Sequence, residues 1–380
     1  MRLIKLLFLV FISVNVSGQV IPKPADVTLE TDSIDLRQVT YGLIPPKGGS
    51  IAFWYNEVNF MPIHQDPLEI IPIELNQSRF DSSGFYSLLI KSNSIKIEGS
   101  EKGIFYGIQT LRQLIAQSNG KLQCRTIIDS PKFAWRGMHL DVCRHFFDIE
   151  FIKKYIDILA MHKMNTFHWH LTEDQGWRIE IKKYPKLTEI GGYRNGTLIG
   201  HYSKEPQQFD GIRYGGFYTQ EEIKEVVKYA EERFITVIPE IELPGHAQAA
   251  ITAYPELGCT DELLEVMQTW GVSDNVFCPT EETFEFLENV LTEVLELFPS
   301  KYIHIGGDES HSTKKKDYIY FVDRVQDIVK KHGKQMMGWD DIVAGSLKSN
   351  SVAQHWSKKE NAKKAVEQNV KIVMSPASKA

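Results

Sequence analysis

The sequence predicts a mixed α/β protein in which a small α+β domain precedes a (β/α)8 barrel of the TIM type, truncated after about its seventh strand. Two observations predict this fold. From residue 133 onward, short apolar runs alternate with amphipathic stretches, a succession typical of a parallel sheet whose strands are connected by helices. Several of these apolar runs end in polar or aromatic residues, as expected where the carboxyl ends of barrel strands carry an active site.

The first eighteen residues form a segment separate from the fold. Arg2 and Lys5 precede an apolar run at residues 6–14, and the small residues Ser17 and Gly18 follow it, which is the layout of a secretory signal peptide. A membrane anchor is the alternative, but the run is well short of the roughly 20 apolar residues that cross a bilayer. We therefore expect cleavage near Gly18, export to the periplasm or the cell exterior, and no membrane span in the rest of the chain.

Residues 19–130 are predicted to form the α+β domain. Alternation of apolar and polar residues indicates strands, and a longer stretch with one apolar face indicates a helix. The predicted elements are two strands and one helix, at residues 84–90, 94–98 and 103–116. The segment 127–132 is the predicted boundary, so the barrel domain occupies residues 131–380.

Seven strands are predicted in the barrel domain, at residues 136–143, 165–170, 235–241, 302–306, 334–338, 351–355 and 370–374. Amphipathic helices separate several of them; one covers residues 284–295, with Glu281 and Glu282 suited to its N-terminus and Pro299 ending it. A complete barrel needs an eighth strand, but the sequence ends at Ala380, directly after the seventh. No glycine-rich phosphate fingerprint follows the first strand, which argues against a dinucleotide-binding sheet.

Composition excludes several classes of function. With 42% hydrophobic and 24% charged residues, the chain has the balance of a folded protein rather than a disordered one. Lys and Arg number 43 against 49 Asp and Glu, a net charge of -6, so no basic field attracts phosphates and no nucleic-acid partner is expected. Aromatic residues make up 11% of the chain, which suits a pocket for a sugar but is also explained by an apolar core.

The four cysteines do not form a disulfide scaffold or a zinc motif, because they are few and widely spaced. Cys259 and Cys278 flank a short polar segment; in an oxidising compartment they can form a disulfide, or they can remain free. Cys143 lies in an apolar run and is expected to be a buried residue rather than a nucleophile.

Polar and ionisable residues gather where the predicted strands end. These clusters lie at residues 141–145, 168–177, 239–246, 304–309, 338–341 and 354–356. Burying so many ionisable groups at one end of a barrel is costly unless they serve a solvated site. The clusters therefore predict a catalytic cleft.

Individual members of these clusters have competing interpretations. Asp308 and Glu309 follow a buried strand and two glycines, which favours a functional pair over surface decoration. His168 and His170 lie two apart, so they share one face of a strand and either bind a metal or order the cleft by hydrogen bonding. Glu240 and Glu242 share a face by the same rule.

Two tryptophans also stand at predicted strand ends. Trp339 and Trp356 are interpreted as walls of a pocket rather than as core residues, because the ends of barrel strands border the active site.

From residue 134 to its end the sequence resembles glycoside hydrolase family 20, the β-N-acetylhexosaminidases. The matching stretches are RGMHLDVCRHF at 136–146, HWHLTEDQGWR at 168–178, PEIELPGH at 239–246 and HIGGDE at 304–309. The region around residues 103–114 is similar to the α+β domain that precedes the barrel in this family. The resemblance implies a retaining enzyme that removes terminal N-acetylglucosamine or N-acetylgalactosamine from oligosaccharides or glycoconjugates, without a cofactor or metal.

The resemblance assigns roles to the neighbouring carboxylates. In this family the 2-acetamido group of the substrate attacks the anomeric carbon and forms an oxazolinium intermediate, in place of a protein nucleophile. Asp308 is expected to accept the acetamido N–H and stabilise its developing charge. Glu309 is expected to protonate the leaving group and then deprotonate water.

The resemblance also implies supporting residues. Asp174 and His246 would form a hydrogen-bonded chain to the general acid, and Arg144 would bind ring hydroxyls through its planar fork of donors. Trp339 and Trp356 would enclose the acetamido methyl group. Asp341 departs from the family pattern, which has glutamate there, and its shorter side chain is expected to weaken a substrate contact.

Family members continue past a stretch like residues 374–378 into a tyrosine and an aspartate that contact substrate, and then an eighth strand with a further tryptophan. We expect their absence to reduce catalysis, so a catalytically impaired sugar-binding fragment is one alternative function. A metal-dependent barrel hydrolase that uses His168, His170, His246 and Asp308 is another.

Overall fold

The computed structural model describes residues 20–46, 51–61, 69–78, 84–260 and 262–376. The predicted signal peptide, residues 1–18, lies outside them. The chain divides into two compact units, one of Met1–Ala134 with Met161–Lys163, the other of Trp135–Ala160 with Met164–Ala380. No helix in the described part of the chain is both long and apolar enough to cross a membrane.

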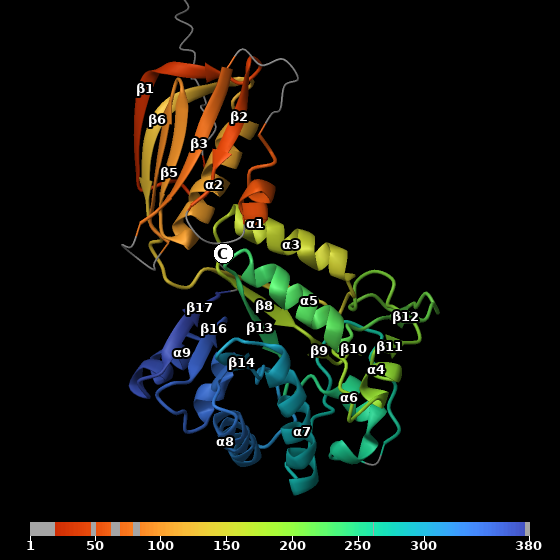
Figure 1. The fold of residues 1–380 in the computed structure, drawn as a ribbon. Helices are drawn as coiled ribbons and strands as arrows, with labels where there is room; N and C mark the ends of the chain where they lie inside the picture. Colours follow the sequence, from red (N-terminus) through yellow and green to blue (C-terminus); the bar gives the residue numbers. More distant parts are fainter. Residues whose placement is uncertain (1–19, 47–50, 62–68, 79–83, 261, 377–380) are drawn as a thin grey trace, which may run out of the picture. The chain divides into compact units, whose positions relative to one another are not determined.

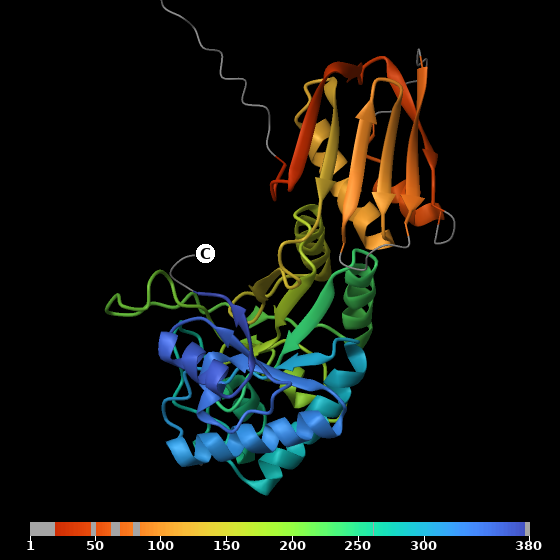
Figure 2. The same ribbon diagram turned by 90° about the vertical axis from the view of Figure 1, so that its left-hand side faces the viewer.

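The first unit is a six-stranded sheet with a helix on one face (Figures 1 and 2). The strands run in the order β1 (Asp26–Asp35), β6 (Lys121–Asp129), β4 (Tyr86–Lys91), β5 (Ser94–Gly99), β3 (Glu69–Gln77) and β2 (Val39–Ile44). The helices are α1 (Ile51–Glu57) and α2 (Glu101–Ala116). Helix α2 begins after Ser100, whose hydroxyl accepts the Gly103 N–H at 3.1 Å, a typical N-cap. The two strands and the helix predicted from alternation and periodicity are confirmed.

The second unit contains seven parallel strands arranged in their order along the chain. They are β7 (Gly137–Asp141), β8 (Thr166–His170), β13 (Thr236–Glu240), β14 (Tyr302–His304), β15 (Gln335–Trp339), β16 (Val352–His355) and β17 (Lys371–Met374). All seven predicted strands are confirmed. The sheet is curled as in an incomplete barrel, and among the described residues β7 and β17 are its edges (Figure 1).

Helices lie along the outer side of the curled sheet (Figures 1 and 2). They are α3 (Ile149–Met161), α5 (Gln220–Glu231), α7 (Glu281–Leu297), α8 (Lys315–Lys331) and α9 (Lys359–Glu367). Helix α7 confirms the predicted helix, with Glu281 and Glu282 in its first turn. Its N-cap is Thr280, whose hydroxyl accepts the Thr283 N–H at 3.2 Å.

Several shorter elements follow the carboxyl ends of the strands. They are the hairpin strands β9 (Thr172–Glu173) and β10 (Gly176–Trp177), the paired strands β11 (Tyr193–Arg194) and β12 (Tyr214–Gly215), the helices α4 (Lys186–Glu189) and α6 (Gln248–Ala253), and the 3-10 turns Pro255–Leu257 and Asp340–Ala344. These segments bring polar residues to the same edge of the sheet.

The cysteines settle an alternative that the sequence left open. Cys259 and Cys278 form a disulfide across 19 residues. Cys143 is a buried free thiol, as expected, and burial raises the pKa of that thiol well above its ordinary value.

Candidate active site

One histidine connects the acidic residues that follow two other strands of the curled sheet. His246, after β13, places Nδ1 2.8 Å from Glu173 Oε1 and 3.5 Å from Asp174 Oδ2, both in the β9–β10 hairpin that follows β8. Its Nε2 lies 3.8 Å from Asp308 Oδ2 and 3.8 Å from Glu309 Oε2, after β14. The structure thus brings four of the sequence-predicted residues, Asp174, His246, Asp308 and Glu309, into one group.

The neighbouring carboxylates are presented by a tight turn. Gly306, Gly307 and Glu309 have φ values of +64°, +95° and +46°, in the left-handed region that glycine adopts without steric cost. A Cβ at Gly306 would overlap the buried carboxylate of Glu242. Tyr318, on α8, donates its hydroxyl proton to the Gly307 carbonyl at 2.5 Å. Strand β14 therefore ends two residues before the predicted limit, and the turn directs both acidic side chains toward His246.

Burial and charge act in opposite directions on this group. Burial raises the pKa of Asp308 to about 7, and the neighbouring charge of Glu240 adds to this while His246 opposes it. Burial also raises the pKa of Glu242 well above its ordinary value, and the charge of Asp308 adds to the effect. Burial alone would lower the pKa of His246, but Glu173 and Asp174 raise it well above its ordinary value. The raised pKa of His246 favours its imidazolium form beside these acidic residues.

Asp174 is fixed by backbone donors as well as by His246. Its Oδ1 accepts the Gln248 N–H at 3.0 Å and its Oδ2 accepts the Ser273 N–H at 3.0 Å. Asp174 is fully buried, so these bonds hold the carboxylate in one orientation. Because His246 contacts Asp174 as well as Asp308 and Glu309, Asp174 can orient the imidazole.

Arg144 lies next to the same group of residues and is partly exposed. Its guanidinium pairs with Asp141 at 3.0 Å and with Glu173, and its side chain remains 31% exposed. The backbone N–H groups of Cys143 and Arg144 donate to Asp141 Oδ1 at 2.8 and 3.1 Å. Although burial opposes it, the charges of His170 and Arg144 lower the pKa of Asp141 to about 2. Glu173 therefore connects Arg144 to His246, a role that the sequence reasoning did not assign.

The sequence reasoning also missed a buried arginine, Arg178, that connects several backbone segments next to this group. Arg178 is fully buried, and its guanidinium donates to backbone carbonyls rather than to a carboxylate. The accepting carbonyls at 3.1 Å or less are those of Val142, Cys143, Gly192 and Gly216. Five donors in a rigid fork suit this task. Its place at the end of the matching stretch 168–178 was the available signal.

The two predicted pocket tryptophans pair with each other. Trp339, at the end of β15, and Trp356, after β16, have ring centroids 6.3 Å apart at 65°. Both are half-buried. The backbone N–H of Trp339 donates to the Gly306 carbonyl at 2.8 Å, which connects the end of β15 to the turn before Asp308. Trp356 Nε1 donates to Asp341 Oδ2 at 3.3 Å, so Asp341 holds an indole in place.

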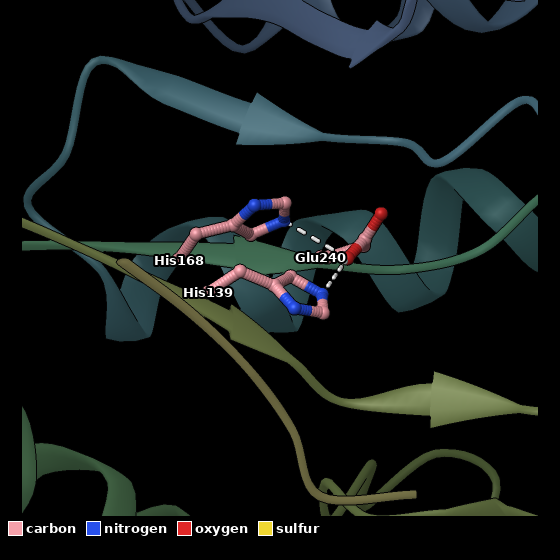
Figure 3. Close-up of side chains that lie close together, drawn as sticks. All are labelled: His139, His168 and Glu240. Atoms are coloured by element: carbon pink, nitrogen blue, oxygen red, sulfur yellow. Dashed lines mark ion pairs between the residues drawn. The ribbon is translucent and has the colours of Figure 1, made fainter. Parts of the chain in front are cut away.

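A second polar cluster surrounds Glu240, at the end of β13. The atoms closest to its carboxylate are His170 Nδ1 at 2.7 Å, His304 Nδ1 at 2.8 Å, His168 Nε2 at 2.9 Å and His139 Nε2 at 3.6 Å. Figure 3 shows two of them, His139 and His168, directed at the glutamate. Burial raises the pKa of Glu240, but the surrounding histidines lower it well below its ordinary value. His168 and His170 thus do share a face, as predicted.

The residue set of the metal-dependent alternative does not converge among the described residues. His168 and His170 contact Glu240, whereas His246 and Asp308 belong with Glu309 in a separate group. The geometry therefore does not favour a metal-dependent hydrolase built on those four residues.

Comparison with known proteins identifies the family. Residues 133–380 match the catalytic domain of glycosyl hydrolase family 20, and residues 64–130 match domain 2 of the same family. The chain belongs to glycosyl hydrolase family 20. The resemblance predicted from the four motifs and the preceding α+β region is confirmed.

Family 20 relatives are similar along most of this chain. A beta-hexosaminidase of Porphyromonas gingivalis is 42% identical over 323 residues, covering 77% of this chain and 40% of that protein. One of Vibrio furnissii is 38% identical over 320 residues, covering 77% of this chain and 52% of that protein. The chain thus spans about half the length of these curated relatives, or less.

Solved family 20 structures share the fold. The β-N-acetylhexosaminidase of Streptomyces coelicolor A3(2) superposes with a TM-score of 0.82 at 29% identity, covering 94% of this chain and 75% of that one. The exo-β-N-acetylglucosaminidase of Vibrio harveyi, solved with N-acetylglucosamine, gives 0.75 at 34% identity, covering 94% and 60%. The predicted fold class is confirmed.

Proposed function

We propose that this family 20 protein is a retaining exo-β-N-acetylhexosaminidase that removes terminal N-acetylglucosamine or N-acetylgalactosamine by substrate-assisted catalysis. The observation that carries the proposal is the position of His246 Nε2, 3.8 Å from both Asp308 and Glu309. Two adjacent carboxylates that share one cation, after one strand, leave no room for an acid and a nucleophile on opposite faces of a sugar. A nucleophile supplied by the substrate fits this arrangement.

Asp308 and Glu309 have different roles in the proposed reaction. Asp308, with its side chain 15% exposed, accepts the acetamido N–H and stabilises positive charge on the oxazolinium ring. Glu309, 34% exposed, donates a proton to the leaving oxygen and later takes one from water. The ion pairs of His246 with Asp174 and Glu173 hold the imidazole that both side chains face.

The remaining predicted residues select the substrate. Arg144, with 31% of its side chain exposed and held by Asp141 and Glu173, presents donors to the hydroxyls of the terminal sugar. Trp339 and Trp356 provide apolar surface for the acetamido methyl group. The substrate is an N-acetylated oligosaccharide or glycoconjugate.

A pair of chromogenic substrates tests substrate assistance. The protein should hydrolyse 4-nitrophenyl N-acetyl-β-D-glucosaminide and leave 4-nitrophenyl β-D-glucoside almost untouched, because the glucoside has no acetamido nucleophile. Comparable rates on the two would refute the proposal. Tight binding of an N-acetylglucosamine thiazoline without hydrolysis of any N-acetylated substrate would instead favour a sugar-binding protein.

A variant tests the general acid. Glu309→Gln should lower kcat/KM for N,N′-diacetylchitobiose by about 10²- to 10⁴-fold, and by less for the nitrophenyl substrate, whose leaving group needs little protonation. The matched control is Glu296→Gln, at an exposed position on α7, which should retain the parental rate. Equal losses on both substrates would place the acid elsewhere.

We also propose that the protein is exported. The support is the basic, apolar and small-residue layout of residues 1–18. N-terminal sequencing of protein from the cell envelope and the medium should find a terminus near Gln19, and an intact Met1 would contradict export by cleavage.

A further inference from the structure

Two loops of the barrel unit lie against each other beside the candidate active site. One, residues 195–213, connects β11 to β12. The other, residues 262–277, is enclosed by the disulfide described above. The backbone N–H of Leu198 in the first loop donates to the Gln268 carbonyl in the second at 3.1 Å. The roles proposed so far include no side chain from either loop.

These loops carry a pair of exposed aromatic side chains. Trp270 is 60% exposed and Tyr202 is 41% exposed, and their ring centroids lie 4.7 Å apart at 42°. All seven tryptophans lie in the described part of the chain, and Trp270 is the only exposed one among them. The same loops expose Ile199, Ile212 and Val272. Single apolar residues are normal on a surface, but a group of them indicates a binding surface.

Hydrogen bonds on both sides of Trp270 fix its loop to residues of the candidate active site. The Ser273 N–H donates to Asp174 Oδ2 at 3.0 Å, and Gln175 Nε2 donates to the Thr269 carbonyl at 3.0 Å. Trp270 follows Thr269 directly and is three residues from Ser273, a stretch of chain that spans at most about 11 Å. The indole therefore lies within reach of a sugar that is linked to one in the active site.

The loop that carries Trp270 lies on the side of the proposed general acid. Ser312 Oγ donates to the Asp274 carbonyl of this loop at 2.7 Å, and Ser312 is three residues after Glu309. In the proposed reaction Glu309 protonates the oxygen of the leaving group, so the leaving group occupies this side of the site. The loop therefore borders the sugars that the reaction releases.

We propose that Tyr202 and Trp270 bind the sugars that follow the scissile bond, so that β-linked oligosaccharides are the preferred substrates. Pyranose rings joined by equatorial β linkages present flat faces of C–H groups, and aromatic side chains in ligand sites provide matching apolar surface. A small leaving group would leave both rings uncovered and gain nothing from them. The inference rests on the proposed function and adds the chemical class of the leaving group to it.

Binding to a protein that cannot cleave its ligand tests the inference. In the Glu309→Gln background, calorimetry measures Kd for N,N′,N″-triacetylchitotriose and for an N-acetylglucosamine thiazoline, which occupies the terminal-sugar site alone. Adding Trp270→Ala should weaken trisaccharide binding by about tenfold, as expected for the loss of one aromatic contact, and thiazoline binding by much less. Trp270→Phe retains a ring and should recover most of the affinity. The control is Tyr320→Ala, at an exposed tyrosine of α8, which should bind both ligands as the background does.

The outcomes separate this inference from the proposed function. Unchanged trisaccharide affinity in Trp270→Ala would overturn the inference, and so would equal losses for the trisaccharide and the thiazoline, which would place the effect in the terminal-sugar site. A changed sedimentation coefficient with unchanged trisaccharide affinity would show that Trp270 joins two copies of the chain, and the inference would be wrong. A parental protein that binds no thiazoline and hydrolyses no N-acetylated substrate would instead refute the proposed function.

Discussion

Replacing Asp308 with asparagine should stabilise the folded protein, by an amount that depends on pH. The side chain of Asp308 is only 15% exposed, and burial with the nearby charge of Glu240 raises its pKa to about 7 against an ordinary 3.8. Asparagine has nearly the same shape as the protonated acid and cannot ionise. The substitution therefore removes the cost of a charge and keeps the packing.

The magnitude follows from the shift of about three pKa units. Each unit corresponds to 1.36 kcal/mol, so ionised Asp308 costs about 4 kcal/mol above pH 7. Between pH 4 and 7 the folded protein retains a proton that the unfolded chain has released, so rising pH favours unfolding over this window. Asp308→Asn should exceed the parent by less than about 1 kcal/mol at pH 4, by about 2 kcal/mol at pH 5 and by about 4 kcal/mol at pH 8.

Denaturant unfolding monitored by tryptophan fluorescence measures this difference. Six of the seven tryptophans follow residue 134, so the signal reports mainly on the barrel unit. Asp274→Asn, at an exposed aspartate, controls for the loss of one surface charge and should match the parent at every pH. A variant no more stable than the parent at pH 8, or a difference that stays constant from pH 5 to 8, would refute the reasoning.

Three further predictions concern the same unit. Since Asp308 has to be ionised to accept an amide N–H, kcat/KM should fall below about pH 7; a flat profile down to pH 5 would contradict that role. Gly306→Ala should cost about 3 kcal/mol, from the positive φ and the overlap with a buried carboxylate, whereas Gly333→Ala, with φ +72° and open space around its Cβ, should cost about 1 kcal/mol; equal losses in denaturant unfolding would refute this. Replacing Cys259 and Cys278 with alanine should lower the free energy of unfolding by about 3 kcal/mol, as expected for a closed loop of 19 residues, and an unchanged denaturation midpoint would show that the bridge adds nothing.

The strands were predictable because each carries its own signal. A short apolar run that ends in a polar cluster marks a barrel strand whatever its neighbours are, and all seven runs form strands. The grouping of Asp174, His246 and the 308–309 pair was also accessible, since carboxyl ends of parallel strands share one edge. The sequence could not predict which side chains from different strands contact each other at that edge. Glu173 sits beside a predicted residue, yet only the fold shows that it bridges Arg144 and His246.

Arg178 illustrates a different limit. A lone arginine in a sequence is normally exposed or paired with a carboxylate, and nothing in its neighbours indicates full burial. Its four close carbonyl partners come from segments up to 38 residues away. Such a role depends on the positions of several loops in the folded structure. The residues next to Arg178 in the sequence do not reveal those positions.

Glu240 and Glu242 show most clearly how tertiary neighbours decide chemistry. Two identical residues two apart were expected to share a face, and both are buried. Glu240 ends β13 against imidazoles from three other strands, which lower its pKa well below the ordinary value. Glu242 lies just past the strand beneath Gly306, where burial and Asp308 raise its pKa. The surroundings thus favour the ionised form of Glu240 and the protonated form of Glu242. If Glu242 were also charged, it would add to the repulsion that already raises the pKa of Asp308, and the proposed catalytic carboxylate would ionise only at a still higher pH.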